Sequence, residues 1–468
     1  MMIKKIEPLL QQKLDDLLAS YPLAQQIVNQ ISQSGGKALL VGGAVRDLLL
    51  GKEVKDLDIE VHGIPLQKLE EILGSYGPVS LVGKSFGVLR EHSLDIDWSM
   101  PRTDLAGRKP EVAIDPFMSF EEAFRRRDLT INAMGIDLVT FELIDPFNGE
   151  QDLRNKVLRA PDAKLFIEDP LRFYRVMQFI GRFEMQPDEQ LNMICKQMDI
   201  STVSRERIEV EFEKLFLKSK SPSLGIRWIH EINRLAQVLP EVAALVGVPQ
   251  DPIWHPEGDV FEHTMQAIDA AAQMHYDLAK TKLILLYAAL CHDLGKADTT
   301  ELIDGKWKSL EHAQEGEMVA KHLLKRITNN IDLIAAVCKL VKYHMMPVQF
   351  MQGEAKSPAY KRLARKLFPD ATLQMLADLA LADKRGRNAQ EHVPLSIEVP
   401  EIKKFLQLAE QLQVRINIEE PILHGRDVMD IVEPGPKMGE LLKHAYEIQI
   451  EEGIKDKETL KKRVLEFL

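Results

Sequence analysis

Two aspartates one residue apart, shortly after a pair of glycines, are the residues of this sequence best suited to chemistry. Gly42-Gly43 follows an apolar run at residues 39–41, and Asp56 and Asp58 come soon afterwards. A glycine turn lets backbone N–H groups approach phosphate oxygens, and the alternation of a strand puts both aspartates on one face. Neighbouring carboxylates repel unless a divalent cation lies between them, and Mg²⁺ prefers carboxylates together with substrate phosphates. The pattern predicts metal-assisted nucleotidyl transfer, with Asp56 and Asp58 as catalytic Mg²⁺ ligands.

Three further acids lie close to this pair in the sequence. Glu60 falls on the same predicted strand face and could assist, although a third acid in this position is more often simply solvated. Asp95 and Asp97 alternate in the same way, so either is a candidate for an additional carboxylate.

Four more motifs follow the glycines and aspartates in a fixed order. They are Arg126-Arg127-Asp128-Leu129-Thr130-Ile131-Asn132-Ala133, Asp145-Pro146-Phe147-Asn148-Gly149 with Asp152-Leu153, Glu168-Asp169-Pro170-Leu171-Arg172, and Ser204-Arg205-Glu206-Arg207. From about residue 41 to about residue 211 the chain therefore resembles the class II tRNA CCA-adding enzymes and bacterial poly(A) polymerases of the polymerase-beta superfamily.

The resemblance implies a set of nucleotide-binding residues, which are Gly43, Arg46, Arg127, Asp128, Asp169, Arg172 and Arg175. Asp169 and Arg172 are three apart, so we expect them on one helix face. A carboxylate accepts hydrogen bonds and a guanidinium donates them, so this pair would select cytosine and adenine without a nucleic-acid template. The chain departs from the family at Gln178, where another arginine is frequent, and at Leu129, where phenylalanine is common.

A second group of chemically capable residues lies in the C-terminal half. His292-Asp293 follows an apolar helical segment, and His263 and Asp383 lie on either side of it in the sequence. These residues resemble the metal ligands of the HD superfamily of phosphohydrolases, which implies metal-dependent phosphoester hydrolysis. His312 and His344 could hold a second ion. Imidazole ligands favour Ni, Mn, Co or Zn over Mg, although Mg stays open.

The expected fold class is α+β: a small mixed α/β head followed by a mostly α-helical neck, HD domain and tail. Strands are expected at 38–41, 57–61, 80–82, 88–89 and 94–98, and residues 102–118 are expected to be a mobile loop because they are polar and contain Gly107 and two prolines. Helices are expected from about 162 to 240 and from about 255 to 390, on either side of a proline-rich passage. The predicted domains are 1–34 (helical extension), 35–160 (head), 161–245 (neck), 250–390 (HD) and 400–468 (tail).

Composition is that of an ordinary soluble globular protein of about three domains. The net charge of −11 argues against a surface devoted entirely to nucleic acid, but leaves local basic faces possible. Three dispersed cysteines and the lack of an evident signal peptide or membrane span lead us to expect a cytoplasmic protein. Candidate basic clusters are Arg125-Arg126-Arg127, Arg205 with Arg207, and Lys361-Arg362 with Arg365-Lys366.

The favoured interpretation is addition of C, C and A to the tRNA 3′ end from CTP and ATP. A poly(A) polymerase, or an enzyme restricted to CC or A addition, is the nearest alternative, and Gly83-Lys84-Ser85-Phe86-Gly87 favours the CCA-adding group. HD-type nucleotide-signalling hydrolases have the opposite domain order. A degenerate RNA-binding module is disfavoured by the intact Asp56 and Asp58. The sequence does not determine the oligomeric state.

Overall fold

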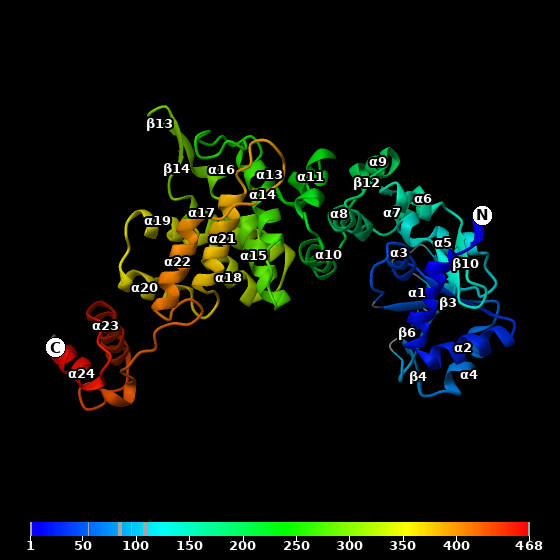
Figure 1. The fold of residues 1–468 in the computed structure, drawn as a ribbon, viewed down its shortest axis with the longest axis horizontal. Helices are drawn as coiled ribbons and strands as arrows, with labels where there is room; N and C mark the ends of the chain where they lie inside the picture. The colour runs from blue at the N-terminus through cyan, green and yellow to red at the C-terminus, as the bar shows by residue number, and fades with distance from the viewer. Residues whose placement is uncertain (1, 55, 83–86, 95, 106–110, 467–468) are drawn as a thin grey trace. The chain divides into compact units, whose positions relative to one another are not determined.

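The fold was analysed in a computed structural model that describes residues 2–54, 56–82, 87–94, 96–105 and 111–466. Contacts along the chain divide it into two compact units, Met1–Val203 and Ser204–Leu468. The first unit contains a mixed sheet with helices, and the second is mostly helical, as the colour ramp of Figure 1 allows the reader to follow. The predicted α+β fold class is confirmed.

Among the described residues, the first unit is built on an eight-stranded sheet in the order β1-β10-β9-β2-β3-β6-β5-β4. The central strand β3 is antiparallel to β2 and parallel to β6. The strands are β1 (Met2–Lys5), β2 (Lys37–Val41), β3 (Leu57–His62), β4 (Val79–Val82), β5 (Val88–Glu91), β6 (Ile96–Ser99), β9 (Gly135–Asp137) and β10 (Glu142–Asp145).

Apolar side chains cover both faces of β2, the strand next to β3. Leu40 belongs to a large core that also contains Ile27 and Ile59, while Leu39 belongs to a smaller core with Phe124. A continuous apolar run is what a strand buried on both faces requires. The helices of this unit are α1 (Pro8–Ala19), α2 (Pro22–Gln33), α3 (Gly43–Leu49), α4 (Leu66–Gly74), α5 (Phe120–Arg125), α6 (Gly149–Arg154), α7 (Ala163–Ile167), α8 (Leu171–Phe183) and α9 (Glu189–Gln197), with a 3₁₀ turn at Thr130–Asn132.

Two predictions about strands in this unit are wrong. The expected loop 102–118 contains an antiparallel pair, β7 (Arg102–Leu105) with β8 (Glu111–Ile114), and neither strand contains the glycine or the prolines that suggested a loop. Strand pairing also occurs inside the stretch 162–240 that was expected to be helical, because β12 (Gln186–Pro187) pairs with β11 (Val157–Leu158). Most of the subtype-indicating stretch 83–87, together with position 95, lies outside the described residues.

The second unit is a helical assembly that carries one hairpin among its described residues. The hairpin, β13 (Thr300–Ile303) with β14 (Lys306–Ser309), departs from the expectation that residues from about 255 to 390 are helical, and it projects from the helical body in Figure 1. Its turn is Asp304-Gly305, with φ values of 54° and 74°, the conformation that two-residue hairpin loops prefer. That dipeptide was the signal that the sequence analysis missed.

Along the chain, the helices of the second unit lie on both sides of this hairpin. The helices from α10 to α17 are α10 (Arg205–Lys218), α11 (Ser223–Glu231), α12 (Leu235–Val238), α13 (Pro240–Ala243), α14 (Val260–Ala272), α15 (Ala279–Cys291), α16 (Lys296–Thr299) and α17 (His312–Ile327). Those from α18 onward are α18 (Ile331–Tyr343), α19 (Met346–Gln352), α20 (Ser357–Leu367), α21 (Leu373–Arg385), α22 (Pro400–Gln411), α23 (Pro436–Glu452) and α24 (Lys457–Leu465).

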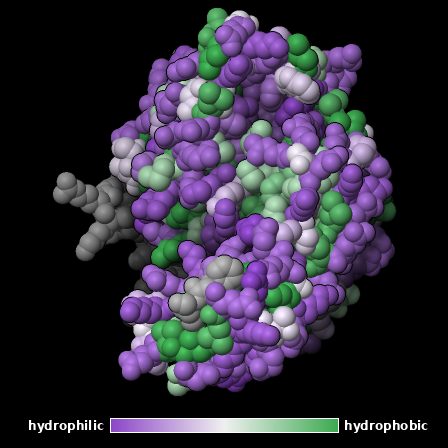
Figure 2. Space-filling view, turned by 90° about the vertical axis from the view of Figure 1, so that its left-hand side faces the viewer, coloured by the Kyte–Doolittle hydropathy of each residue, from purple (hydrophilic) through white to green (hydrophobic). Residues whose placement is uncertain are grey.

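The surface is mainly polar on the face seen in Figure 2, where hydrophobic residues form separate small patches. Among the described residues, no helix is both long enough and apolar enough to span a bilayer.

Candidate active sites

The predicted catalytic aspartates lie at the start of the central strand β3. Asp58 is in β3 and pairs in register with Asp97 on β6, whereas Asp56 lies just before the strand. Both aspartates reach solvent. The surrounding protein still removes part of the hydration of Asp58, and this desolvation raises its pKa; Asp97 and Asp56 raise it further, against the opposing effect of Arg127. A group of carboxylates that disfavour one another's charge is suited to a cation.

Glu60 is not a solvated third acid, contrary to expectation. It is 1% exposed, and its carboxylate accepts from Arg127 Nη2 at 3.1 Å and lies 3.0 Å from His62 Nε2. Burial alone would raise the pKa of Glu60, but His62 and Arg127 outweigh it and lower the pKa to about 2. Glu60 therefore holds the Arg127 guanidinium rather than offering itself to solvent. Asp97 accepts from Arg90 at 2.6 Å, while Asp95 is outside the described residues.

Arg127 also approaches the glycine turn that precedes α3. Gly42 has a φ of 69°, and a Cβ added there would lie 2.9 Å from Arg127 Nη1. Glycine suits this position because of its positive φ, and a Cβ there would also displace the end of the guanidinium. A Cβ on Gly43 would similarly lie 3.3 Å from Nη2 of Arg46. The turn and two predicted nucleotide-binding arginines are packed as one group.

Asn132, which was not predicted as a site residue, links two predicted nucleotide-binding residues, Arg46 and Asp128. Its Oδ1 accepts from Arg46 Nη1 at 2.6 Å, and its Nδ2 donates to Asp128 Oδ1 at 3.0 Å. Asp128 Oδ2 in turn accepts from Arg175 Nε at 2.7 Å. Burial would raise the pKa of Asp128, but Arg175 and Asn132 lower it to about 2, so this carboxylate is ionised at neutral pH. The signal in the sequence was that Asn132 lies inside the motif from Arg126 to Ala133.

The predicted geometry of Asp169 and Arg172 is wrong. Helix α8 begins at Leu171, so Asp169 lies in the preceding turn, where its carboxylate accepts from the Leu171 N–H at 3.2 Å. Proline at position 170 and this local side-chain bond explain why the helix starts late. Arg172 donates from Nη1 to the Leu165 carbonyl at 2.8 Å and lines a pocket of about 320 Å³ with Arg102, Arg125 and Arg126.

The two positions where the chain departs from the family are buried in the first unit. Gln178, in α8, is 1% exposed, and its Oε1 has no hydrogen-bond partner among the described residues. Leu129 is fully buried. Neither side chain is therefore directed at solvent, which fits a packing role for both Gln178 and Leu129.

The second predicted site brings together all four of its predicted ligands. His263 Nε2 lies 3.3 Å from Asp383 Oδ1 and 3.6 Å from Asp293 Oδ2, and His292 Nε2 lies 3.2 Å from that same Asp293 oxygen. His263 comes from α14, His292 from the end of α15, and Asp383 from α21. Donor atoms from three separate helices thus converge on one point.

His312 and His344 form an adjacent group around the other oxygen of Asp293. Their Nε2 atoms lie 3.5 and 3.8 Å from Asp293 Oδ1 and 3.2 Å from one another. Sets of potential ligand atoms therefore lie on both sides of Asp293. Burial lowers the pKa of His344 to about 3, which keeps its imidazole neutral and able to coordinate.

The Nδ1 atom of each histidine in these two groups has a protein acceptor. The acceptors are the carbonyls of Ala289, Ser309 and Val341 for His292, His312 and His344, and Glu257 Oε1, at 2.7 Å, for His263. A histidine whose Nδ1–H is bound in this way turns a lone pair of Nε2 towards the centre. The Nε2 atoms of His263 and His292 are only 3.2 Å apart, and two facing lone pairs repel unless a cation lies between them. The residues present therefore fit a metal.

A cationic pocket of about 530 Å³ opens onto this site. Its lining includes Asp293, Asp383 and the histidines 312 and 344, together with five cations, which are Lys296, Lys306, Lys308, Lys384 and Arg387. Lys296 Nζ lies 2.8 Å from Asp293 Oδ2, and Arg387 Nη2 lies 2.6 Å from Asp383 Oδ1. The pocket combines metal-ligand chemistry with a field that attracts anions.

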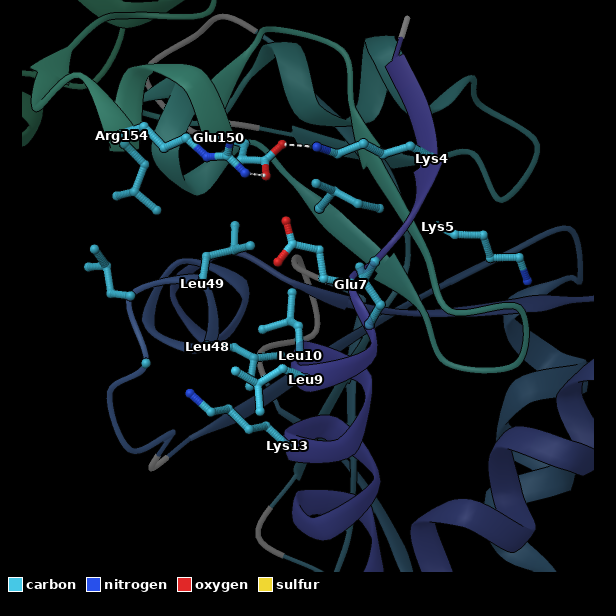
Figure 3. A pocket seen from close by; sticks show the side chains of 15 residues that line it. Lys4, Lys5, Glu7, Leu9, Leu10, Lys13, Leu48, Leu49, Glu150 and Arg154 are labelled. Carbon is cyan, nitrogen blue, oxygen red and sulfur yellow. Dashed lines mark hydrogen bonds and ion pairs between the residues drawn. The ribbon is translucent and has the colours of Figure 1, made fainter.

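Another pocket in the first unit, of about 360 Å³, contains none of the predicted site residues. Figure 3 shows Leu9, Leu10 and Leu48 on one side of it, with Glu150 between Lys4 and Arg154. Glu150 pairs with Lys4 at 2.5 Å and with Arg154 at 2.7 Å, so both of these cations already have an acidic partner.

Comparison with known proteins explains both groups of residues. The poly A polymerase head domain family matches residues 38–159, and the HD domain family matches residues 260–384. A multifunctional CCA protein of Pasteurella multocida is 31% identical over 403 residues, which cover 83% of this chain and 92% of the relative. One from Xanthomonas campestris is 31% identical over 428 residues, covering 87% and 97%. This chain belongs to the family of multifunctional CCA proteins.

The fold of this multifunctional CCA protein family member is shared with solved CCA-adding enzymes. The Thermotoga maritima enzyme complexed with tRNA is 19% identical, with a TM-score of 0.61 over 99% of both chains. The Bacillus stearothermophilus enzyme in complex with CTP is 18% identical, with a TM-score of 0.63 over 98% of both chains. At such identities the likeness establishes the fold, and the family assignment rests on the closer relatives.

Proposed function

We propose that this protein adds C, C and A to the 3′ end of tRNA, using CTP and ATP and releasing pyrophosphate. The observation that carries this proposal is that Asp56 and Asp58, at the start of β3, lie near Arg127, which Glu60 binds and which approaches the glycine turn at Gly42. Membership of the multifunctional CCA protein family supports it. We further propose a cytoplasmic location, for which the three free buried cysteines are the supporting observation.

Asp56 and Asp58 would hold Mg²⁺ at this site. Bound there, the ion supplies charge neutralisation for the triphosphate and the leaving pyrophosphate. Glu60 fixes one side of the Arg127 guanidinium, and Asn132 fixes Arg46. Such positioned donors stabilise phosphate charge without reorganising during the reaction, which is how proteins contribute most to nucleotidyl transfer.

Selection of cytosine and adenine would fall to Asp169 and Arg172. They are not on one helix face, but Asp169 precedes α8 and Arg172 lies in its first turn, so both side chains belong to the same helix start. We expect Asp169→Ala to lose discrimination against GTP and UTP more than it loses metal binding. An incorporation assay with all four triphosphates checks this, and unchanged selectivity would exclude the base-reading role.

The activity itself is tested with tRNA transcripts that lack three, two or one terminal nucleotides. CTP and ATP are supplied separately and together. Stepwise completion that stops after the terminal A supports CCA addition. Continued A addition would identify a poly(A) polymerase, and completion of only part of the sequence would identify a CC- or A-adding enzyme.

We also propose a metal-dependent phosphohydrolase activity at the second site. His263, His292, Asp293 and Asp383 would hold one ion, and Asp293, His312 and His344 a second. The ligand set favours Ni, Mn, Co or Zn, with Mg as the alternative. The bound metal would supply Lewis-acid activation for phosphoester hydrolysis, while Lys296 and Arg387 would bind the phosphate charge. Chelation followed by readdition of each ion separately should abolish and then restore hydrolysis, with the restoring ion identifying the native class.

A further inference from the structure

Each of the four arginines predicted to bind the nucleotide lies over a phenylalanine ring. The distances from the guanidinium carbon to the ring centroid are 4.7 Å for Arg46 over Phe183, 5.3 Å for Arg127 over Phe124, 5.8 Å for Arg172 over Phe166 and 5.5 Å for Arg175 over Phe179. Separations within about 6 Å indicate attraction between a cation and the face of the ring. The rings come from α5, α7 and α8, so three helices contribute to one aromatic layer.

This aromatic layer restrains the arginines without occupying their hydrogen-bond donors. A guanidinium carries five N–H donors and no acceptor, and an aromatic ring attracts its charge without accepting a conventional hydrogen bond. Three of the rings are buried: Phe124 and Phe166 fully, and Phe179 to 2% exposure. The rings therefore form a fixed support, and the N–H groups above them stay available to oxygen atoms.

The half-buried Phe183, at the end of α8, is the ring with the most cations around it. Besides Arg46, the Nζ atom of Lys52 lies 4.6 Å from its centroid and the guanidinium carbon of Arg182 lies 4.7 Å away. Asp47 joins two of these cations, because it lies 2.8 Å from Arg46 Nη2 and 3.6 Å from Arg182 Nη2. Side chains from α3 and α8 thus meet at this one ring.

Phe183 also stacks on Phe179, one turn earlier in the same helix. The two centroids are 5.6 Å apart and the ring planes differ by 20°. Phe179 in turn lies 5.4 Å from the guanidinium carbon of Arg46 and 5.5 Å from that of Arg175. The pair of rings therefore connects the arginine of α3, the helix that follows the glycine turn, with an arginine of α8, the helix that begins at the base-selecting residues.

We propose that Phe183, supported by Phe179, is a positioning residue for nucleotide binding, which fixes the Arg46 guanidinium and joins the glycine-turn helix α3 to the base-selecting helix α8. This inference rests on the nucleotide addition proposed above. Phe183 acts through Arg46, which serves the triphosphate, and the triphosphate is common to CTP and ATP. Loss of the ring should therefore weaken the binding of both nucleotides and leave the choice of base unchanged.

Steady-state kinetics of nucleotide addition on the full-length protein test this role. Phe183→Leu keeps an apolar side chain but removes the aromatic face. It should raise KM for CTP and for ATP by about 2- to 30-fold, the range expected for one cation–π contact, with little change in kcat. Discrimination against GTP and UTP should stay at the wild-type level. Phe183→Tyr keeps the aromatic face and should retain the wild-type KM.

A purely structural role for Phe183 makes a different prediction. Ile180→Val is the matched control, because Ile180 is a buried residue of the same helix and its truncation loosens packing without removing a ring. It should lower Tm and leave KM unchanged. An unchanged KM in Phe183→Leu, an equal rise in Ile180→Val, or a raised KM in Phe183→Tyr would overturn the proposal. Phe183→Met replaces Phe183→Leu if the latter does not fold.

Calorimetric titration with CTP in the presence of Mg²⁺ separates this inference from the function on which it rests. If the wild-type protein binds CTP but adds no nucleotide to tRNA, the proposed function fails. The positioning role then stands only if Phe183→Leu binds CTP about 2- to 30-fold more weakly and Phe183→Tyr does not. Equal affinities of the wild-type protein and Phe183→Leu would reject it, and a wild-type protein that binds no nucleotide would reject both.

Discussion

At the scale of single residues, the two sites share one device: a buried acid that orients a cationic or imidazole group rather than reacting. Glu60 holds Arg127 in the head, and Glu257 holds His263 in the second unit. Burial would raise the pKa of Glu257, but His255 and His263 lower it to about 2, so it acts as a permanent acceptor. Positioning by such neighbours is what sets ligand orientation and basicity.

Glu257→Gln should weaken metal binding at the second site by about 10- to 100-fold, because the Nδ1 partner of His263 would lose its charge. Titration of the metal-free protein with Mn²⁺ or Zn²⁺ measures this directly. Glu262→Gln is the matched control. Glu262 precedes His263 on α14, but its carboxylate binds Arg227 at 2.6 Å instead of the histidine. Equal affinities for the two variants would contradict the role of Glu257.

Sequence reasoning identified the residues that take part in chemistry more reliably than it identified the residues that position them. Asp56, Asp58 and the HD ligands stood out because their types and spacing match metal chemistry. Asn132 and Glu257 were not singled out, because an amide or an acid inside a motif has no distinguishing chemistry until its partners are known. The placement of Asp169 failed for a local reason, since a three-residue spacing implies one helix face only if both residues are in the helix.

At the scale of elements, close backbone contact between two helix starts positions the group formed by Asp293, His312 and His344. A Cβ on Gly295 would lie 2.1 Å from the His312 carbonyl and 2.6 Å from the Gly316 N atom. Gly295 immediately precedes α16, and His312 begins α17. Only glycine allows these two helix starts to approach so closely.

Gly295→Ala should therefore displace the first turn of α17 and lower stability by about 1–3 kcal/mol. It should also reduce the number of ions bound, because His312 would move away from Asp293. Thermal unfolding and metal analysis by mass spectrometry check both effects. Gly439→Ala in α23 is the control, because a Cβ there would meet no atom within 4 Å. A Gly295→Ala variant with full stability and metal content would refute this explanation.

A buried carboxyl links α11 to α14 and should make stability depend on pH. Asp269 accepts from the Ser223 N–H at 2.9 Å and hydroxyl at 2.6 Å, with Arg227 and Glu262 nearby. Burial raises the pKa of Asp269 from 3.8 to about 7, despite the opposing effect of Ser223. Below about pH 3.8 the group is neutral in both states; as pH rises towards 7 the unfolded chain ionises first, so stability is lost.

Asp269→Asn should remove this loss. The shift of about three pH units corresponds to at most about 4 kcal/mol. Urea unfolding between about pH 4 and pH 7.5 gives the free energy of unfolding of both proteins. The difference between the two values at each pH cancels the contributions of other titrating groups. Parallel stability curves for the two proteins would show that Asp269 ionises without penalty.

The elements themselves were predictable where hydrophobic patterns were long. The buried strands β2 and β3 and the apolar helix α15 follow directly from their sequences. The short pairs β7–β8 and β13–β14 were not predicted, because strands of four residues have little periodicity. For β13–β14, the turn at Asp304-Gly305 was the one available signal, and it was missed.

At the scale of the whole molecule, the two candidate sites lie in different compact units. Of the predicted basic clusters, Lys361 and Arg362 are paired with acids of the C-terminal region, Glu419, Glu447 and Glu451. This cluster therefore anchors the tail of the second unit, which reduces its suitability as an RNA-binding face.

Because the ligand sets are separate, the two activities should be separable by mutation. Asp56→Ala combined with Asp58→Ala should reduce nucleotide addition by at least about 10³-fold, as expected for loss of metal ligands that neutralise transition-state charge, and retain hydrolysis at the second site. His292→Ala should have the opposite effect. Parallel assays of both activities on each variant check this, and loss of both activities in either folded variant would show that the sites depend on one another.

The central claim is that Asp56 and Asp58 hold a cation that carries a nucleoside triphosphate at the start of β3. Calorimetric titration of the protein with CTP and with ATP, with Mg²⁺ and then with EDTA, tests it most directly. We predict binding of both nucleotides that requires Mg²⁺ and disappears in the folded Asp58→Asn variant. Mg²⁺-independent binding, or undiminished binding by Asp58→Asn, would contradict the claim.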